Sequence, residues 1–202
     1  MRRIVLASTN EGKVREFRHL LKQFHVVGLK ELAGAPEVIE DGETFEQNAL
    51  KKARAIATWS NEIVIADDSG LEVDALDGRP GVHSARYAGS HGDDKANITK
   101  LLADLGALAL RDAPFTARFR CVLGLVDPES KRERTFSGVC GGSITRTQRG
   151  EHGFGYDPVF VVAGTNRTMA ELTPEEKSRA SHRASALSKL FPALEELLTV
   201  KA

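Results

Sequence analysis

An apolar run that ends in two adjacent carboxylates constrains this chain more than any other stretch. The residues Ile63-Val64-Ile65-Ala66 predict a buried strand, and Asp67 and Asp68 follow directly, ahead of Ser69-Gly70. Ionised carboxylates at the end of a buried strand lose hydration and repel one another unless cations or hydrogen-bond donors compensate them. Because side chains alternate across a strand, we expect the two aspartates to point to opposite faces, one holding local structure while the other faces a cleft. The alternative is a plain exit from strand to turn, which Asp, Ser and Gly favour.

Composition narrows the function classes. The 202 residues suit one domain, or one domain with two lobes, and a hydrophobic content of 41% is enough for a core. The formal net charge of +0 gives no field that attracts nucleic acid or a membrane surface, so we expect neither partner. Cys121 and Cys140 lack metal-ligand spacing and predict buried thiols in a reducing compartment. Because Met1–Leu6 does not form a signal peptide and no apolar run reaches membrane-spanning length, we expect a cytoplasmic protein.

Patterns along the chain predict alternating strands and helices, followed by a hairpin. Expected strands are Ile4–Ala7, Val26–Val27, Ile63–Ala66, Thr116–Val126 and Arg134–Ile144. Expected helices begin near Gly12, at a Thr44 cap and at a Thr173 capping box, and two more cover Lys95–Leu105 and His182–Leu198. Because alternation favours parallel strands and a hairpin adds an antiparallel one, we predict an α/β fold with a mixed sheet flanked by helices.

The loop Ser8-Thr9-Asn10-Glu11-Gly12-Lys13 joins the first strand to the first helix. The unpaired N–H groups and partial positive charge of a helix N-terminus suit phosphate, and Lys13 adds a full charge. Ala7 stands in place of the first glycine of a Walker A loop, and Val14 stands where magnesium binding needs Ser or Thr. A kinase or ATPase of that type is therefore disfavoured, and an ordinary polar cap with a solvated lysine is the alternative.

An acidic stretch, Glu40–Glu46, precedes and opens the helix that Thr44 is expected to cap. Acids favour the N-terminal end of any helix, but this does not explain Asn48 and Lys52, which lie one turn apart on the face of Phe45. A lysine on such a face either reaches into a cleft or extends along the surface to solvent.

Two later segments carry groups suited to a base. Gly153–Pro158 combines two glycines, which allow close approach to a flat ligand, with Phe154 and Tyr156 as stacking surfaces; the alternative is an anchored turn. Glu176–Arg183 crowds basic groups at a helix junction, where donors suit keto oxygens or phosphate; the alternative is a solvated helix start. Together these four stretches indicate a nucleoside triphosphate site without a P-loop.

In this order, the motifs resemble the inosine/xanthosine triphosphate pyrophosphatase family, the Ham1-type house-cleaning enzymes. The matching stretches are Ser8–Lys13, Thr44-Phe45 with Asn48-Ala49 and Lys52-Ala53, Ala66–Leu71, Ser84–Gly89, Gly153–Phe160 and Ser181–Arg183. Each is weak alone, whereas the ordered set spans nearly the whole chain and is specific. The resemblance implies a single pyrophosphatase domain over residues 1–202, an elongated α/β fold with a nucleotide cleft between two lobes, and a cytoplasmic homodimer.

The resemblance also implies an activity and a set of site residues. The activity is Mg²⁺-dependent hydrolysis of ITP, dITP and XTP to the monophosphate and pyrophosphate, which removes these nucleotides before their incorporation into DNA or RNA. Asp68 is implied as the general base, with Asp68 and Glu40 as metal ligands; Glu43 and Glu46 are close alternatives to Glu40. The implied phosphate-binding residues are Ser8, Thr9, Asn10, Glu11, Gly12, Lys13, Lys52 and Lys177, and those for sugar and base are Ser69, Phe154, Gly155, Tyr156, Asp157, His182 and Arg183.

The mechanistic hypothesis is that water attacks the α-phosphorus and pyrophosphate leaves, with adjacent cations keeping Asp68 ionised at neutral pH. Donors from Arg183, His182 or backbone amides are expected to accept a 6-keto oxygen and to reject the amino group of adenine. Two other functions stay open: a Maf-type pyrophosphatase for pyrimidine or modified nucleotides, and a non-catalytic nucleotide sensor. His83 and His152 are expected to be surface or structural residues.

Overall fold

The computed structural model describes residues 3–108 and 114–199, which form two compact units. Unit 1 consists of Met1–Asp68, Cys121–Gly138 and Arg183–Ala202, and unit 2 consists of Ser69–Arg120 and Val139–His182. Strands β3 (Val64–Val73), β4 (Phe115–Asp127) and β5 (Arg132–Ile144) each contribute residues to both units. Unit 1 is therefore assembled from three separate segments of the chain, and Asp68 is the last residue of the first segment.

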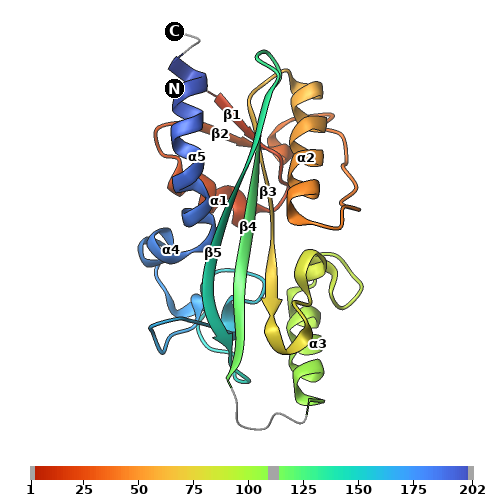
Figure 1. Ribbon diagram of the computed structural model, residues 1–202, viewed down its shortest axis with the longest axis vertical. Helices are drawn as coiled ribbons and strands as arrows, with labels where there is room; N and C mark the ends of the chain where they lie inside the picture. Colours follow the sequence, from red (N-terminus) through yellow and green to blue (C-terminus); the bar gives the residue numbers. More distant parts are fainter. Residues whose placement is uncertain (1–2, 109–113, 200–202) are drawn as a thin grey trace. The chain divides into compact units, whose positions relative to one another are not determined.

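The strands form one mixed sheet in the order β2-β1-β3-β4-β5-β6. The other elements are β1 (Arg3–Leu6), β2 (His25–Gly28), β6 (Phe160–Val162), α1 (Glu11–Leu20), α2 (Phe45–Ser60), α3 (Asp94–Gly106), α4 (Pro174–Ala180) and α5 (His182–Thr199) (Figure 1). Strand β1 pairs in parallel with β2 and β3, whereas β6 pairs antiparallel with β5. The predicted mixed α/β fold is thus confirmed. Within the described residues, no helix is long and apolar enough to cross a membrane.

Unit 1 places helices on both faces of its strands, because successive residues of β1 and β3 are apolar and point to opposite faces. Ile4 and Ile65 face one way, in a buried cluster with side chains of α1 and α5. Val5 and Val64 face the other way, in a cluster with side chains of α2. Figure 1 shows α5 and α2 on opposite sides of β1. Each buried aliphatic side chain of this kind contributes roughly 1.5–3 kcal/mol, so the period-two pattern fixes the arrangement.

Strand β3 departs from the prediction, because it does not end at Ala66. It continues through Asp67 and Asp68 to Val73, so the two carboxylates lie inside a strand, and the predicted strand end at Ala66 and the alternative of a turn are both wrong. The alternation continues with Leu71 and Val73, both 0% exposed, and burial of these side chains favours extended backbone over a turn.

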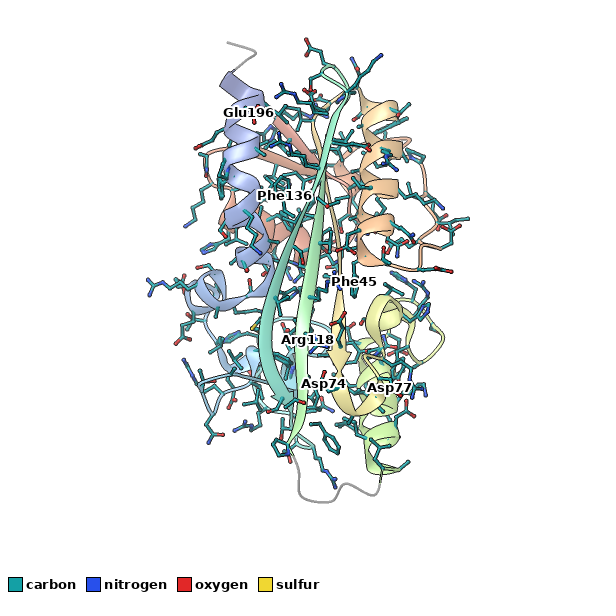
Figure 2. The ribbon with its side chains drawn as sticks, in the orientation of Figure 1. Phe45, Asp74, Asp77, Arg118, Phe136 and Glu196 are labelled. Carbon is teal, nitrogen blue, oxygen red and sulfur yellow. The ribbon has the colours of Figure 1, made fainter. Side chains whose placement is uncertain are left out.

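Unit 2 has its own apolar core. Ile98, Leu101 and Leu105 on one face of α3 pack in a cluster with Leu71 of β3 and with residues of β4 to β6. At the surface, the guanidinium of Arg118 on β4 forms ion pairs with Glu72 (Nε to Oε2, 2.7 Å) and Asp74 (Nη1 to Oδ1, 3.0 Å). Figure 2 shows Arg118 close to Asp74. Exposed ion pairs contribute little to the free energy of folding. Unit 2 is therefore stabilised mainly by burial of the apolar face of α3.

The predicted helix starts are confirmed by their caps. The Thr44 hydroxyl accepts a hydrogen bond from the Gln47 amide at 3.2 Å, and Phe45 begins α2 directly after it (Figure 2). Thr173 and Glu176 form a reciprocal capping box at the start of α4. Cys121 and Cys140 are free buried thiols, also as predicted.

Gly124 of β4 allows α2 to lie directly against the sheet in unit 1. A Cβ atom at this position would lie 2.8 Å from the backbone oxygen of Ala49 and 3.1 Å from the backbone nitrogen of Leu50. Helix backbone cannot yield as a side chain does, so we expect Gly124→Ala to lower the free energy of unfolding by about 1–3 kcal/mol, measured by urea denaturation. Gly141→Ala on β5 is the matched control, since a Cβ there has no neighbour within 4 Å. Equal stability of the two variants would contradict this account.

Candidate active site

Asp67 lies at the centre of a buried ion-pair cluster in unit 1. Its side chain is fully buried, and Oδ1 forms an ion pair with Nζ of Lys13 in α1. Its Oδ2 accepts from Nε of Arg183 at 3.1 Å and from the thiol of Cys121 at 3.2 Å. Burial alone would raise the pKa of Asp67, but the charges of Lys13 and Arg183 and the hydrogen bond from Lys13 hold it well below its ordinary value. Asp67 is therefore ionised and fixed in place.

Asp68 points to the other face of β3, as the alternation predicts. Its side chain is 5% exposed, and Oδ2 has no hydrogen-bond partner among the described residues. A buried carboxylate oxygen without a donor is costly, and such groups persist in folded proteins where they bind or react. The two adjacent aspartates thus differ in role: Asp67 is compensated on every side, while Asp68 keeps an open acceptor.

Burial raises the pKa of Asp68 from its ordinary value of 3.8 to about 6. Desolvation is the largest cause, and nearby Glu40 adds to it, while the charges of Lys52 and Lys13 act in the opposite direction. Burial therefore outweighs the charges of Lys52 and Lys13, but a pKa of about 6 still leaves Asp68 ionised at neutral pH, as expected. A carboxylate with this pKa is still mostly ionised at pH 7 and close to the range of an efficient general base.

The face of α2 that carries Asn48 and Lys52 lies against Asp68 and the acidic loop. Nζ of Lys52 donates to Oε1 of Glu40 at 2.9 Å and to the backbone oxygen of Asp67 at 2.7 Å. The Asn48 side chain is 0% exposed and forms a hydrogen bond that lowers the pKa of Asp68. Glu40, one of the three candidate glutamates, therefore contacts Lys52 and raises the pKa of Asp68.

The loop from Ser8 to Lys13 forms a polar helix cap. Oδ1 of Asn10 accepts from the Lys13 amide at 3.0 Å, and the Ser8 hydroxyl accepts from the Asn10 amide at 3.2 Å. Beside the loop lies a cavity of about 350 Å³. Its lining includes Ser8, Thr9, Glu11, Val14, Arg15, Arg18, Gly28, Lys30 and Glu31. Lys13 is paired with Asp67 rather than solvated, so the simple alternative for this lysine is wrong.

Asp157 organises the glycine-rich loop in unit 2. Its Oδ2 accepts from Nζ of Lys177 at 2.6 Å and from the Phe154 amide at 3.1 Å. Gly153 has a φ of +92°, and a Cβ there would lie 2.0 Å from the same carboxylate oxygen. The amide of Gly155 donates to Oδ2 of Asp94 at the start of α3 (2.7 Å). The backbone amides of this loop are therefore held by carboxylates.

The prediction that Tyr156 offers a stacking surface is wrong, because its ring is buried. Its ring is 4% exposed within the apolar cluster of unit 2, and its hydroxyl donates to the Ser84 backbone oxygen at 2.9 Å. Such a ring anchors the loop and cannot serve as the stacking surface that the sequence pattern predicted. Phe154 is half-buried, and the His182 ring stacks on Phe119 with centroids 4.9 Å apart.

The structure adds partners that sequence reasoning missed. Glu16 of α1 accepts from Nη1 of Arg183 at 2.9 Å, so this arginine joins two carboxylates in unit 1. Cys121, predicted only as a buried thiol, donates to Asp67. Neither residue lies in a motif, and both act across long sequence separations that no local pattern encodes. His83 and His152 are exposed, which agrees with their expected surface position.

The described residues contain no group of three or more His, Cys, Asp or Glu side chains placed to hold a metal ion. The carboxylates on the Lys52 side of β3, Asp68 and Glu40, are nevertheless hard oxygen donors, and Oδ2 of Asp68 is unengaged.

The fold and this site define an α/β protein whose buried carboxylates are surrounded by lysine, arginine and a helix N-terminus, an arrangement suited to phosphate-bearing molecules. A sequence profile described as the Ham1 family matches residues 4–193. The chain belongs to this family.

Relatives and solved structures agree with that assignment. The chain is 48% identical over 197 residues to a dITP/XTP pyrophosphatase of Bacillus subtilis, covering 96% of this chain and 98% of the relative. A dITP/XTP pyrophosphatase of Staphylococcus aureus is 46% identical over 195 residues, covering 96% and 97%. The structure of the Staphylococcus aureus Ham1 protein superposes with a TM-score of 0.82 at 45% identity, covering 96% of this chain and 99% of that one. The structure of a HAM1 protein from Coxiella burnetii superposes with a TM-score of 0.84 at 42% identity, covering 97% of this chain and 100% of that one.

Proposed function

We propose that this chain hydrolyses non-canonical purine nucleoside triphosphates, namely ITP, dITP and XTP, to the nucleoside monophosphate and pyrophosphate. The observation that carries the proposal is the unpartnered Oδ2 of Asp68, a buried carboxylate oxygen beside Lys52 and Glu40. The names of the relatives supply the substrate class. By removing these nucleotides, the enzyme would keep them out of DNA and RNA.

In the proposed reaction, water attacks the α-phosphorus and Asp68 accepts one of its protons. A bond forms between the water oxygen and the α-phosphorus, and the bond to the bridging oxygen breaks, so that pyrophosphate leaves with the electron pair. Ionised Asp68 is suited to this step because its pKa of about 6 lies near neutral pH. Lys13 and Lys52 stabilise the charge that spreads over the phosphate oxygens.

Mg²⁺ is the cofactor that we propose for this site. Its preferred ligands are carboxylate oxygens, and the open oxygen of Asp68 and the neighbouring carboxylate of Glu40 fit that preference. When bound, the ion would neutralise phosphate charge. Asp68 and Glu40 would hold it, while Lys52 keeps Glu40 in position through their 2.9 Å ion pair.

The remaining site residues are assigned by the kind of group they offer. We propose that Ser8, Thr9, Asn10, Glu11, Gly12, Lys13, Lys52 and Lys177 bind phosphate, and that Ser69, Phe154, Gly155, Asp157, His182 and Arg183 position the sugar and base. Donors from Arg183 and His182 would favour a 6-keto purine over adenine. We further propose that residues 1–202 form one pyrophosphatase domain that acts as a homodimer in the cytoplasm.

The proposed function is tested by product analysis. We expect purified protein with Mg²⁺ to convert ITP, XTP and dITP to monophosphate and pyrophosphate, with little turnover of ATP or GTP, as resolved by anion-exchange chromatography. Orthophosphate as the first product would show attack at the γ-phosphorus and refute the mechanism. Turnover confined to pyrimidine or modified nucleotides would favour a Maf-type activity, and binding without turnover would favour a sensor.

A further inference from the structure

Two side chains on one face of α2 each join the acidic loop to strand β3. Lys52 links Glu40 of the loop, at 2.9 Å, to the backbone oxygen of Asp67, at 2.7 Å. One turn earlier, Oδ1 of Asn48 accepts from the Gly42 amide at 2.8 Å, and Nδ2 donates to the Gly42 oxygen at 3.4 Å. Helix α2 therefore contacts the loop that carries Glu40 at two points one turn apart.

The Asn48 side chain is fixed in this position by burial and by its hydrogen bonds with Gly42. It is 0% exposed, and a buried amide is retained only when its donors and acceptor find partners. A Cβ at Gly42 would lie 2.7 Å from Oδ1 of Asn48, so the loop needs glycine at this point for the close approach. The amide also forms a side-chain hydrogen bond with Asp68.

From these contacts we infer that Asn48 is a positioning residue, which holds the Asp68 carboxylate and the Glu40-bearing loop at a fixed separation so that the open oxygen of Asp68 faces metal and water. The inference rests on the proposed function. An amide suits this role better than a lysine or a carboxylate, because one neutral group donates to Asp68 and accepts from Gly42 without adding charge beside two carboxylates. A metal ligand that lacks such a partner typically loses ten- to hundredfold in metal affinity.

Asn48→Ala tests the inference, with Gln47→Ala as the matched control. Gln47 is an exposed neighbour on the same helix, and its Oε1 accepts from the Glu43 amide at 2.8 Å, so it anchors the same loop without touching Asp68. We expect Asn48→Ala to weaken binding of Mn²⁺ alone, measured by electron paramagnetic resonance, by about tenfold or more. At saturating Mg²⁺ we expect kcat for ITP to fall at least tenfold while KM changes less than threefold. Gln47→Ala is expected to stay within twofold of the parent in all three quantities.

Other outcomes count against the inference. If Asn48→Ala lowers the melting temperature but leaves Mn²⁺ affinity and kcat within twofold, Asn48 is only a structural residue. If Gln47→Ala has equal effects, general anchoring of the loop is responsible. Should Asn48→Ala fail to fold, Gly42→Ala displaces the amide from the loop side, and unchanged Mn²⁺ affinity and kcat in that variant would refute the role. An inactive parent enzyme would refute the proposed function instead, and Mn²⁺ affinity would still test the positioning.

Discussion

Asp68→Asn is expected to abolish turnover of ITP, lowering kcat by a factor of 10³ or more, while nucleotide binding persists. The amide has nearly the same shape as the carboxylate but cannot accept a proton from the attacking water. The substitution removes the general base and also the negative charge of a proposed metal ligand, so we expect kcat to fall more than either loss alone would cause. The measurements are single-turnover hydrolysis of ITP, and calorimetric binding of a non-hydrolysable α,β-imido analogue to both proteins.

The same substitution is expected to stabilise the metal-free protein. The pKa of Asp68 is raised from 3.8 to about 6, so the folded state binds more protons than the unfolded state between these values. Stability from this residue is therefore fully present below pH 4, falls as the pH rises, and is lost above about pH 6. We expect Asp68→Asn to gain about 1–3 kcal/mol in urea denaturation at pH 8 in EDTA, and little at pH 4.

Two results would remove Asp68 from its assigned role. Turnover within tenfold of the parent would show that another group activates water. A variant that is destabilised at pH 8 as much as at pH 4 would show that the buried carboxylate is satisfied after all. Asp41→Asn provides a control for both measurements, because Asp41 is exposed and forms a surface ion pair with Lys51 at 2.5 Å.

The second large effect is expected for Asp67→Asn, which should lower the free energy of unfolding by about 3–5 kcal/mol. The substitution leaves the partly buried ammonium of Lys13 and the buried guanidinium of Arg183 without the charge that compensates them. Removing one partner of a buried ion pair costs far more than removing an exposed one. Urea denaturation at pH 7 measures the loss. Glu133→Gln is the matched control, since its pair with Arg54 is half exposed and is worth at most about 1 kcal/mol.

The pH dependence of this loss has a defined sign. Because the pKa of Asp67 lies well below its ordinary value, the ionised carboxylate stabilises the fold above pH 3.8 and less so as the pH falls further. The stability difference between parent and Asp67→Asn should therefore shrink from pH 5 to pH 3. A difference that stays constant over this range would mean that shape, rather than charge, makes Asp67 necessary.

Local periodicity was sufficient to predict much of the site. The period of two across β3 placed Asp67 and Asp68 on opposite faces, and the helical period placed Asn48 and Lys52 on the buried face of α2. Both predictions rely only on the geometry of a single element, which its own residues determine. The Thr44 cap was predictable for the same reason.

The features that local sequence patterns did not predict depend on contacts between residues far apart in the chain. Arg183 binds Asp67 across 116 positions, and no spacing rule links the two. Tyr156 was expected to offer a stacking surface, but the apolar residues that bury its ring come from distant segments of unit 2. The length of β3 was misjudged because Asp-Asp-Ser-Gly is typical of a turn, and only the burial of Leu71 and Val73 overrides that local preference.

The discontinuity of unit 1 also matters while the chain is being made. The ribosome releases Lys13 and Asp67 early, but Arg183 and the apolar face of α5, with Leu187, Leu190 and Leu194, emerge only at the end of translation. Until then the sheet face carrying Ile4 and Ile65 lacks α5, one of the two helices that cover it. A messenger RNA truncated before α5 would therefore yield a polypeptide whose sheet leaves apolar side chains exposed and whose buried Asp67 lacks its partner Arg183. Cellular quality control degrades products of this kind.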